Sequence, residues 1–428
     1  MRGMRKIVIA CCIAVASISV CRADDGPGTY FAPESGTANV VVQPKANPNA
    51  KIHKTVAFLG GSITEMHGYR PRVMAALRKK YPDVDFTEIA AGISSTCSDT
   101  GAFRLAEDVL AKGAPDLFFV EESVNDDQDG HFDRVHAIRG MEGIVRRVRE
   151  KCPRCEIVVG LMVNRGQYDA RMSGKTPMIC EVHAEVARHY GATIADVGAA
   201  LAASAAAGGF SWTEYRDCHP SPAGCDFAAD VIMNAIDAAF NPYAEAKVKA
   251  LPHPMDEKSY FRGTVVPFAS VCIDGGWNVS QPDWSKVPGS KREQFVQGDA
   301  LWSETPGAEF SFSFRGTAAA AILTSGPDVG AVEVSVDGGE WRRVDLVSPY
   351  SRTLNYPNAK FFADGLPDAV HEIKVRLVEA THEWGGGKAV RINRLVVNGI
   401  LIRSETSINA TGNDCGTDTA KWMITRKI

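Results

Sequence analysis

The sequence predicts an α/β domain with a parallel sheet, followed by an antiparallel β-sandwich domain. Up to residue 240, short apolar runs alternate with helix-length segments, which is typical of parallel strands covered on both faces by helices. Beyond residue 260, runs that alternate apolar and polar residues predominate, as in strands with one buried face. The strands expected in the first domain contain Val56–Leu59, Phe86–Ala90, Leu117–Val120, Ile157–Val163 and Thr193–Val197.

Residues 261–403 are expected to form the second domain. The run at residues 332–336 ends in Asp337-Gly338-Gly339, which is a hairpin signal. Prolines with charged neighbours predict a linker at residues 241–260, and residues 404–428 are assigned to a C-terminal tail. The strands expected in the sandwich contain Ala308–Phe314, Val332–Val336, His371–Leu377 and Val390–Val397.

Residues 1–23 have the pattern of an export signal. Three basic residues precede an apolar run at residues 7–20, and the segment ends in Cys21-Arg22-Ala23. The run is too short to span a bilayer comfortably, and no later stretch could cross a membrane. We therefore expect a secreted or periplasmic protein with an N-terminal extension at residues 24–53. Lipoprotein anchoring through Cys21 is the second interpretation, because Val20 is bulky where a small residue is expected.

Charge disfavours nucleic acid as a partner. Removing the four basic residues of the signal from the 47 Lys and Arg leaves 43, against 51 Asp and Glu, so the remaining chain carries a formal charge of −8. Nucleic-acid-binding domains are instead basic, at least on one face.

Eight cysteines remain after removal of the signal, and an even number in an exported chain permits disulfides. Cys152 and Cys155 could form a local disulfide, half of a zinc site or a redox pair. A disulfide is favoured, because no second Cys-x-x-Cys completes a four-thiolate site. Cys218 and Cys225 could form another bridge or could both be small buried residues.

A serine follows the first apolar strand directly, in the run Gly60-Gly61-Ser62-Ile63-Thr64. Its glycines allow a sharp turn and leave room beside the hydroxyl, and residues 69–80 are predicted to form the next helix. The run lacks the Gly-Lys-Ser/Thr ending of a nucleotide-binding loop. Ser62 is therefore a candidate nucleophile, with a purely structural turn as the alternative.

A base for this serine is available in the segment that begins at Asp217 and precedes a helical pattern at residues 227–240. A serine hydroxyl is a poor nucleophile until an imidazole takes its proton, and a carboxylate improves that imidazole. His219 and Asp217 could fill these two roles. The alternative is a turn in which Asp217 caps the helix and His219 lies on the surface.

Two further candidates follow the second and third predicted strands. Gly92 and Asn125 lie at strand ends, and the carboxyl ends of parallel strands share one edge of a sheet. Acyl transfer requires donors for the developing oxyanion, which the N–H of Gly92, the amide of Asn125 and the N–H of Ser62 could supply. Taken singly, Gly92 could be an ordinary turn glycine and Asn125 a capping residue.

Together, these four blocks resemble the SGNH hydrolase superfamily, or GDSL-like esterases, over residues 54–240. The resemblance implies a flavodoxin-like three-layer α/β/α fold, with Ser62 as nucleophile, His219 as base, and Ser62, Gly92 and Asn125 as the oxyanion hole. Two positions depart from the family pattern. Ala90 replaces an Asn found in many members, and Arg216 stands where the acid is usual.

Asp217 is therefore the expected acid, with Glu214 and Asp196 as substitutes. A weakened acid would slow the reaction without changing its class, because the acid orients the base and makes no bond. The absence of Gly-x-Ser-x-Gly around Ser62 argues against the α/β-hydrolase fold.

The stretch from Asn125 to Gly130 also resembles the start of a calcium loop. Its twelfth position is His136, and the bidentate carboxylate of such loops is missing. We therefore expect a solvated acidic loop, and neither a metal nor an organic cofactor.

Six of the seven tryptophans lie beyond residue 260, where they could stack on sugars or fill a sandwich core. An esterase domain with an appended jelly-roll-like domain is similar to secreted bacterial carbohydrate esterases. The resemblance implies a serine esterase that removes a small acyl group, acetyl in the favoured case, from a polysaccharide or oligosaccharide through an acyl-enzyme. The alternatives are a glycan-binding protein with a decayed hydrolase domain, and a lipase or thioesterase of the same superfamily.

Overall fold

The computed structural model describes residues 51–404 and 422–423. The expected export signal, Cys21 and most of the N-terminal extension and C-terminal tail lie outside the described residues. No helix in residues 51–404 combines the length and the apolar character needed to cross a membrane.

The first domain is built on a parallel sheet of five strands in the order β2-β1-β3-β4-β5. This is the flavodoxin-like order, and it confirms the predicted fold class. The first apolar run forms β1, which lies between β2 and β3, so the turn that carries Ser62 follows an inner strand of the sheet. The strands are β1 (Ile52–Gly60), β2 (Val84–Gly92), β3 (Leu117–Glu121), β4 (Glu156–Gly160) and β5 (Thr193–Ala195).

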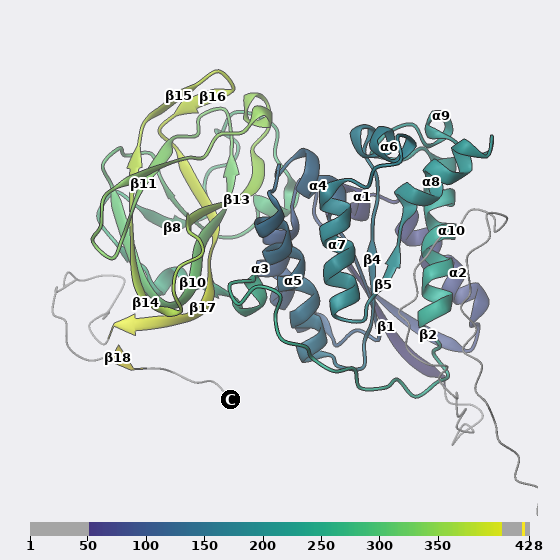
Figure 1. Ribbon diagram of the computed structural model, residues 1–428. Helices are drawn as coiled ribbons and strands as arrows, with labels where there is room; N and C mark the ends of the chain where they lie inside the picture. The colour runs from purple at the N-terminus through teal and green to yellow at the C-terminus, as the bar shows by residue number, and fades with distance from the viewer. Residues whose placement is uncertain (1–50, 405–421, 424–428) are drawn as a thin grey trace, which may run out of the picture.

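Helices cover both faces of this sheet (Figure 1). Successive residues of β1 point to opposite faces, as strand geometry requires. Val56 and Phe58 join one apolar cluster, and Ala57 and Leu59 join the other. The helices are α1 (Ser62–Glu65), α2 (Tyr69–Lys80), α3 (Ser98–Asp108), α4 (Ser123–Gln128), α5 (Arg134–Lys151), α6 (Arg165–Met172), α7 (Met178–His189), α8 (Val197–Ala206), α9 (Trp212–Tyr215) and α10 (Pro222–Ala239), with a 3-10 turn η1 (Leu110–Lys112).

The second domain is an antiparallel β-sandwich, as predicted. The long strand β10 (Glu309–Ser325) links its parts, since its first half pairs with β14 and its second half with β13. The register of β10 shifts near Gly316, where a Cβ would lie 2.1 Å from the carbonyl oxygen of Asn398. The expected hairpin after β11 is present, with positive φ angles of 54° at Asp337 and 73° at Gly338.

The other elements of this domain are short strands and 3-10 turns. The strands are β6 (Gly263–Val266), β7 (Cys272–Ile273), β8 (Asn278–Ser280), β9 (Ala300–Ser303), β11 (Ala331–Val336), β12 (Arg342–Asp345), β13 (Tyr356–Ala363), β14 (Ala369–Val378), β15 (Ala380–His382), β16 (Gly385–Gly387), β17 (Val390–Ser404) and β18 (Trp422–Met423). The turns are η2 (Tyr260–Arg262), η3 (Phe268–Ser270), η4 (Glu293–Phe295) and η5 (Pro349–Arg352).

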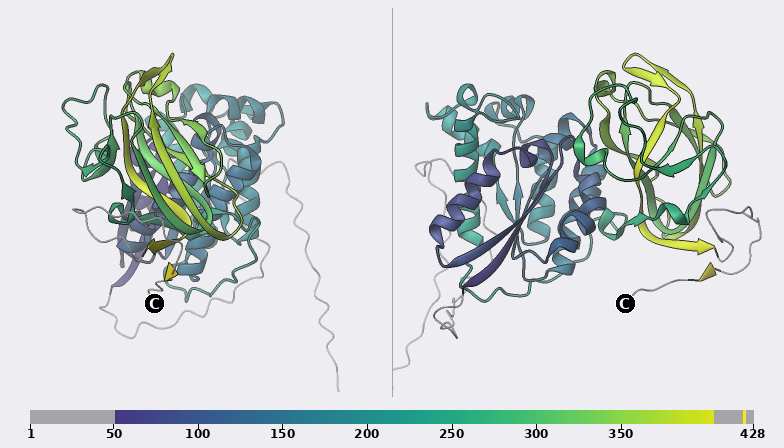
Figure 2. Two further views of the ribbon diagram at one scale, coloured as in Figure 1. Left: turned by 90° about the vertical axis from the view of Figure 1, so that its left-hand side faces the viewer. Right: turned by 180° about the vertical axis from the view of Figure 1, so that it is seen from behind.

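The two domains share an apolar core. Figure 2 shows the sandwich against α3 and α5 of the first domain. Phe295 and Ile322 of the sandwich belong to the same buried cluster as Phe103 and Ile89 of the first domain. Arg139 of α5 adds ion pairs at 2.7 Å to Asp256 and at 2.9 Å to Asp364. The domains are therefore packed as one body, not hung from a linker.

The favoured disulfide between Cys152 and Cys155 is wrong, because both residues are free thiols. The Cys155 thiol donates to the carbonyl of Glu156 at 3.3 Å. The bridge between Cys218 and Cys225 is wrong as well. The Cys225 thiol donates to the carbonyl of Pro220 at 3.6 Å, whereas Cys218 lies beside His219.

The expectation of a solvated acidic loop at residues 125–130 is wrong, because most of this stretch is helical and its first two residues are buried. Asn125 to Gln128 belong to α4, and the side chain of Asp126 is fully buried. Asp126 accepts hydrogen bonds from the Ser98 amide at 2.8 Å and from His183 Nε2 at 2.9 Å. These bonds fix α4 to its neighbours α3 and α7, and so fix the position of Asn125.

Candidate active site

Ser62 follows the carboxyl end of β1 and is the first residue of α1. A hydrogen bond of 2.7 Å joins its Oγ to Nε2 of His219. Gly61 makes this turn possible, because a Cβ there would lie 2.2 Å from Oδ1 of Asn125. Ser62 is half-buried and His219 is exposed, so a substrate can reach the pair from solvent.

The loop that carries His219 is held by the helix that follows it. The Oγ of Ser221 accepts from the Gly224 amide at 3.0 Å and caps α10, which has Pro222 in its first turn. On the other side, Arg216 has φ 84° and ψ −57°, the conformation of a strained γ-turn. The chain therefore changes direction sharply just before Asp217 and His219.

The second ring nitrogen of His219 faces a thiol. Its Nδ1 lies 3.7 Å from Sγ of Cys218. Oδ1 of Asp217 accepts from the Cys218 amide at 2.6 Å, and among the described residues no hydrogen bond joins Asp217 to the His219 ring. Burial, with the neighbouring Asp217 carboxylate as a second cause, raises the pKa of Cys218 to about 11, so the thiol keeps its proton near neutral pH.

The two substitute acids are engaged elsewhere. Glu214 accepts from the amide and the hydroxyl of Ser211 and so caps the short helix α9. Asp196 caps α8 and forms an ion pair with Arg171 at 2.9 Å. Neither of these carboxylates is bonded to His219, and Asp217 remains the carboxylate nearest to His219 in sequence.

Strand register brings Gly92 close to the turn that carries Ser62, since Gly92 pairs with Gly60 across β1 and β2. A Cβ at Gly92 would lie 2.3 Å from the backbone nitrogen of Glu65 and 2.6 Å from the carbonyl carbon of Thr64. Only glycine therefore allows β2 to end against the backbone of α1.

Asn125 comes from the start of α4, which follows β3. Its side chain is 2 % exposed, and its Nδ2 donates to Oδ2 of Asp129 at 2.7 Å. Since a carboxylate only accepts, this partner fixes which end of the amide is nitrogen. One N–H of the amide is used by Asp129, and the second remains for another acceptor.

Sequence reasoning missed four residues that surround this site. Glu65 accepts from the Ser94 amide at 2.8 Å and also from the Ser94 hydroxyl, which holds the loop after Gly92 although Ala90 lacks the usual Asn. Asp129 is the second. Tyr350 and Gln294 of the sandwich are the third and fourth, and only the folded chain brings them here.

Two buried carboxyl groups lie behind the site at the end of β3. Burial raises the pKa of Glu121 to about 8, and the N–H of Val124 offsets only part of this effect. Burial also raises the pKa of Glu122 well above its ordinary value. Because the Glu121 side chain is fully buried and its pKa is raised to about 8, this carboxyl group is expected to be mostly neutral at pH 7.

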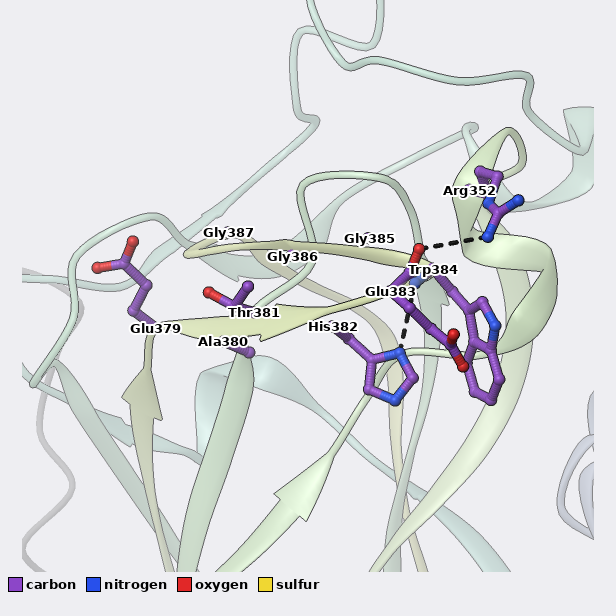
Figure 3. Close-up of a pocket in the computed structure, with 10 residues that line it drawn as sticks. All are labelled: Arg352, Glu379, Ala380, Thr381, His382, Glu383, Trp384, Gly385, Gly386 and Gly387. Atoms are coloured by element: carbon purple, nitrogen blue, oxygen red, sulfur yellow. Dashed lines mark hydrogen bonds between the residues drawn. The ribbon is translucent and has the colours of Figure 1, made fainter.

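A hollow of about 450 Å³ lies on the sandwich, next to the turn η5 that carries Tyr350. Figure 3 shows Trp384 between His382 and Arg352, and the Arg352 guanidinium donates to the carbonyl of Glu383 at 3.4 Å. The rings of His382 and Trp384 are 4.3 Å apart. In Figure 1 the hairpin β15–β16, which lines this hollow, and the helices α1 and α4 lie at the same end of the molecule.

The fold and this site define a class of protein. A three-layer α/β/α domain with a serine and a histidine in hydrogen-bond contact at the carboxyl edge of its sheet is a serine hydrolase domain. Residues 58–227 match the model of the GDSL-like lipase/acylhydrolase family, so this chain contains a domain of that family and is a serine ester hydrolase. The predicted family and enzyme class are confirmed.

Among solved structures, two match most of this chain and a third matches less than half of it. A two-domain esterase active on acetylated mannans, co-crystallized with mannopentaose, is 24% identical with a TM-score of 0.62, over 82% of this chain and 92% of that chain. Another structure of such an esterase has a TM-score of 0.63 at the same identity and coverage. An acetylxylan esterase from Geobacillus stearothermophilus is 19% identical with a TM-score of 0.35, over 46% of this chain and 100% of its own. A search of curated protein sequences gave no match.

Proposed function

We propose that this protein is an exported esterase that removes a small acyl group, acetyl in the first instance, from a glycan through an acyl-enzyme. The observation that carries the proposal is the hydrogen bond of 2.7 Å between Ser62 Oγ and His219 Nε2. It lies at the edge of the sheet where Gly92 and Asn125 also lie. The chemistry that follows uses side chains and backbone only.

In the acylation step, His219 Nε2 takes the proton of Ser62 while Oγ attacks the ester carbonyl. The resulting oxyanion accepts hydrogen bonds from the backbone N–H of Ser62 and Gly92 and from the Asn125 amide. Collapse of this intermediate breaks the bond to the sugar oxygen, which takes the proton from His219. Water then repeats the sequence on the acyl-enzyme, releasing the carboxylic acid and restoring Ser62.

Asp217 is proposed as the acid of the site, acting on His219 through Cys218. Its carboxylate hydrogen-bonds Cys218, whose sulfur faces Nδ1 of His219. Asp217 is exposed, so solvent screens its charge at the imidazole. We therefore expect a smaller contribution than that of a carboxylate bonded directly to the ring.

The glycan substrate is proposed on two grounds. The two-domain esterases with the same architecture act on acetylated mannans, and one was crystallized with mannopentaose. In this chain, a hollow with a half-buried tryptophan lies on the sandwich at the end of the molecule that holds the catalytic serine. Aromatic faces of this kind pack well against sugar rings.

The decisive experiment replaces Ser62 with alanine. Ser62→Ala should lower hydrolysis of p-nitrophenyl acetate by about 10⁴-fold or more, because serine and histidine act as a unit. Acetate release from acetylated mannan should be lost in parallel. Ser285→Ala is the matched control, since its exposed hydroxyl bonds only to Asp283 in the sandwich. Undiminished hydrolysis by the Ser62→Ala variant would refute the proposal.

One observation favours a second candidate, a glycan-binding protein without catalysis. Among the described residues, no carboxylate contacts the His219 ring. This candidate predicts that the wild-type protein binds acetylated mannan and cleaves neither it nor p-nitrophenyl acetate. A lipase or thioesterase would instead prefer long acyl chains, which a series of p-nitrophenyl esters from acetate to palmitate tests directly.

A further inference from the structure

We propose that the β-sandwich domain positions the oxyanion hole of the hydrolase domain, through Tyr350 and Gln294. This inference rests on the proposed roles of Asn125 and Gly92 as oxyanion donors. Two separate hydrogen-bonded chains run from the sandwich into the site, and each ends on one of these donors' segments. The appended domain would then serve catalysis itself, in addition to any part in binding substrate.

The first chain ends on Asn125. The hydroxyl of Tyr350 donates to Oδ1 of Asp129 at 2.9 Å, and Oδ2 of the same carboxylate accepts from Nδ2 of Asn125 at 2.7 Å. Asp129 follows α4 directly and is only partly buried, so its side chain could rotate without these partners. Tyr350 thus holds the carboxylate that orients the amide.

Tyr350 is well placed for this task although it is 45% exposed. Its ring stacks on Tyr356 with centroids 4.8 Å apart and an interplanar angle of 22°. Burial of the hydroxyl, with the Asp129 charge as second cause, raises the pKa of Tyr350 to about 12, so the phenol remains a donor in neutral and mildly alkaline solution.

The second chain ends on the segment of Gly92. Gln294 of η4 donates to Oε1 of Glu65, and Oε2 of Glu65 accepts from the Ser94 amide at 2.8 Å. Ser94 is two residues beyond Gly92, and Glu65 ends α1, which begins at Ser62. Phe295, next to Gln294, is buried in the core that both domains share, which fixes the start of this chain.

The reason that such contacts should affect rate is geometric. An oxyanion donor works at about 2.7–3.1 Å from the developing charge, and a displacement of about 1 Å can cost about 100-fold. Asn125 has one N–H on Asp129 and one left for the oxyanion. If the Asp129 side chain can move, the Asn125 amide can therefore move as well.

The test uses the full-length protein and p-nitrophenyl acetate, which is too small to occupy a glycan site on the sandwich. Tyr350→Phe removes one hydroxyl and should lower kcat about tenfold, with KM within about twofold of wild type. Tyr243→Phe is the matched control, since it also removes a phenol that donates to a carboxylate, Asp83, away from the site. The control should keep wild-type kcat and lose no less thermal stability than Tyr350→Phe.

A double-mutant cycle separates positioning from general loosening. Asp129→Ala should lower kcat by tenfold to a hundredfold, and adding Tyr350→Phe to it should change kcat by less than twofold, because the hydroxyl acts only through Asp129. Gln294→Ala tests the second chain in the same assay and should lower kcat severalfold.

Wild-type kcat in both Tyr350→Phe and Gln294→Ala would overturn the inference, as would full additivity of Tyr350→Phe with Asp129→Ala. These results would leave the proposed function intact if Ser62→Ala is inactive. Undiminished activity of the Ser62→Ala variant would refute both the inference and the proposed function.

Discussion

The two domains contribute residues to the candidate active site in different ways. In the hydrolase domain, Ser62, Gly92 and Asn125 follow the ends of parallel strands, and the backbone itself brings them to one edge. In the sandwich, Tyr350 and Gln294 lie on 3-10 turns between strands, and only their side-chain tips reach that edge. The first arrangement is a property of the fold, whereas the second depends on how two domains pack.

This difference teaches where the protein should tolerate change. A Cβ at Gly92 would meet the backbone of α1, and a Cβ at Gly61 would meet the side-chain amide of Asn125. The sandwich contacts are single hydrogen bonds, each worth about 0.5–3 kcal/mol. Substitutions at Ser62, at its partner His219 and at Gly92 should therefore have the largest effects on activity, and substitutions of the sandwich residues that reach the site should reduce activity by degrees.

The largest effect is expected from His219→Ala. Loss of the base should lower kcat/KM for p-nitrophenyl acetate by about 10⁴-fold or more, since Ser62 would then keep its proton. His53→Ala is a suitable control, because that histidine is exposed at the start of β1 and pairs with Asp85. Comparable activity in His219→Ala and His53→Ala would show that His219 is no more important for catalysis than an exposed histidine outside the site, which would contradict the account of the hydrolase domain.

Gly92→Ala should come next. Its Cβ would meet the backbone of Thr64 and Glu65 at 2.6 Å and 2.3 Å, so α1 or β2 must shift. We expect about 100-fold loss of kcat and about 1–3 kcal/mol lower free energy of unfolding by urea titration.

Gly275→Ala in the sandwich provides the contrast for that variant, because nothing lies within 4 Å of its added Cβ. It should keep wild-type activity and stability. Equal behaviour of the two alanine variants would show that the strand end at Gly92 is not constrained as described.

Asp217→Asn should have an intermediate effect. Direct loss of a triad carboxylate can cost about 10⁴-fold, but Asp217 contacts the ring only through Cys218, so we expect a tenfold to hundredfold fall in kcat. Asp283→Asn, an exposed site in the sandwich, is the control. A loss as large as that of His219→Ala would mean that Asp217 bonds the imidazole directly during turnover.

The smallest effect on activity is expected from Glu121→Gln, which should act on stability. The raised pKa of about 8 means that the folded protein keeps a proton that the unfolded chain releases above its ordinary pKa of 4.5. Wild type should therefore lose stability as pH rises from 4.5 towards 8, and the glutamine variant should not.

Urea unfolding at pH 5 and pH 8 measures this difference. From pH 5 to pH 8, the free energy of unfolding of wild type should fall relative to that of the variant by on the order of 3 kcal/mol. A pH-independent difference would show that the carboxyl of Glu121 is ionised in the folded state.

Much of the hydrolase domain could be predicted from sequence, and particular residues show why. The helix expected at residues 69–80 is α2 (Tyr69–Lys80), and all five expected strands form in one parallel sheet. A glycine or a polar residue directly after an apolar run marks a strand end, and parallel pairing then brings the strand ends together. Local pattern and tertiary position are linked here by the topology.

The remaining features depend on contacts that sequence does not encode locally. The spacing of Cys152 and Cys155 permits a bridge, but the Cys155 thiol instead bonds to the backbone. Nothing near Tyr350 in sequence indicates Asp129, which is 221 residues away. The contact of 3.7 Å between Sγ of Cys218 and Nδ1 of His219 likewise depends on the conformation of the loop and not on the order of the residues alone.

The most direct test of the central claim is labelling of the wild-type protein with a fluorophosphonate, followed by peptide mass spectrometry. A serine activated by His219 should form one phosphonyl adduct, on the peptide that contains Ser62, and prior incubation with p-nitrophenyl acetate should slow its formation. An active enzyme that carries the adduct on another residue, or carries none, would contradict the account.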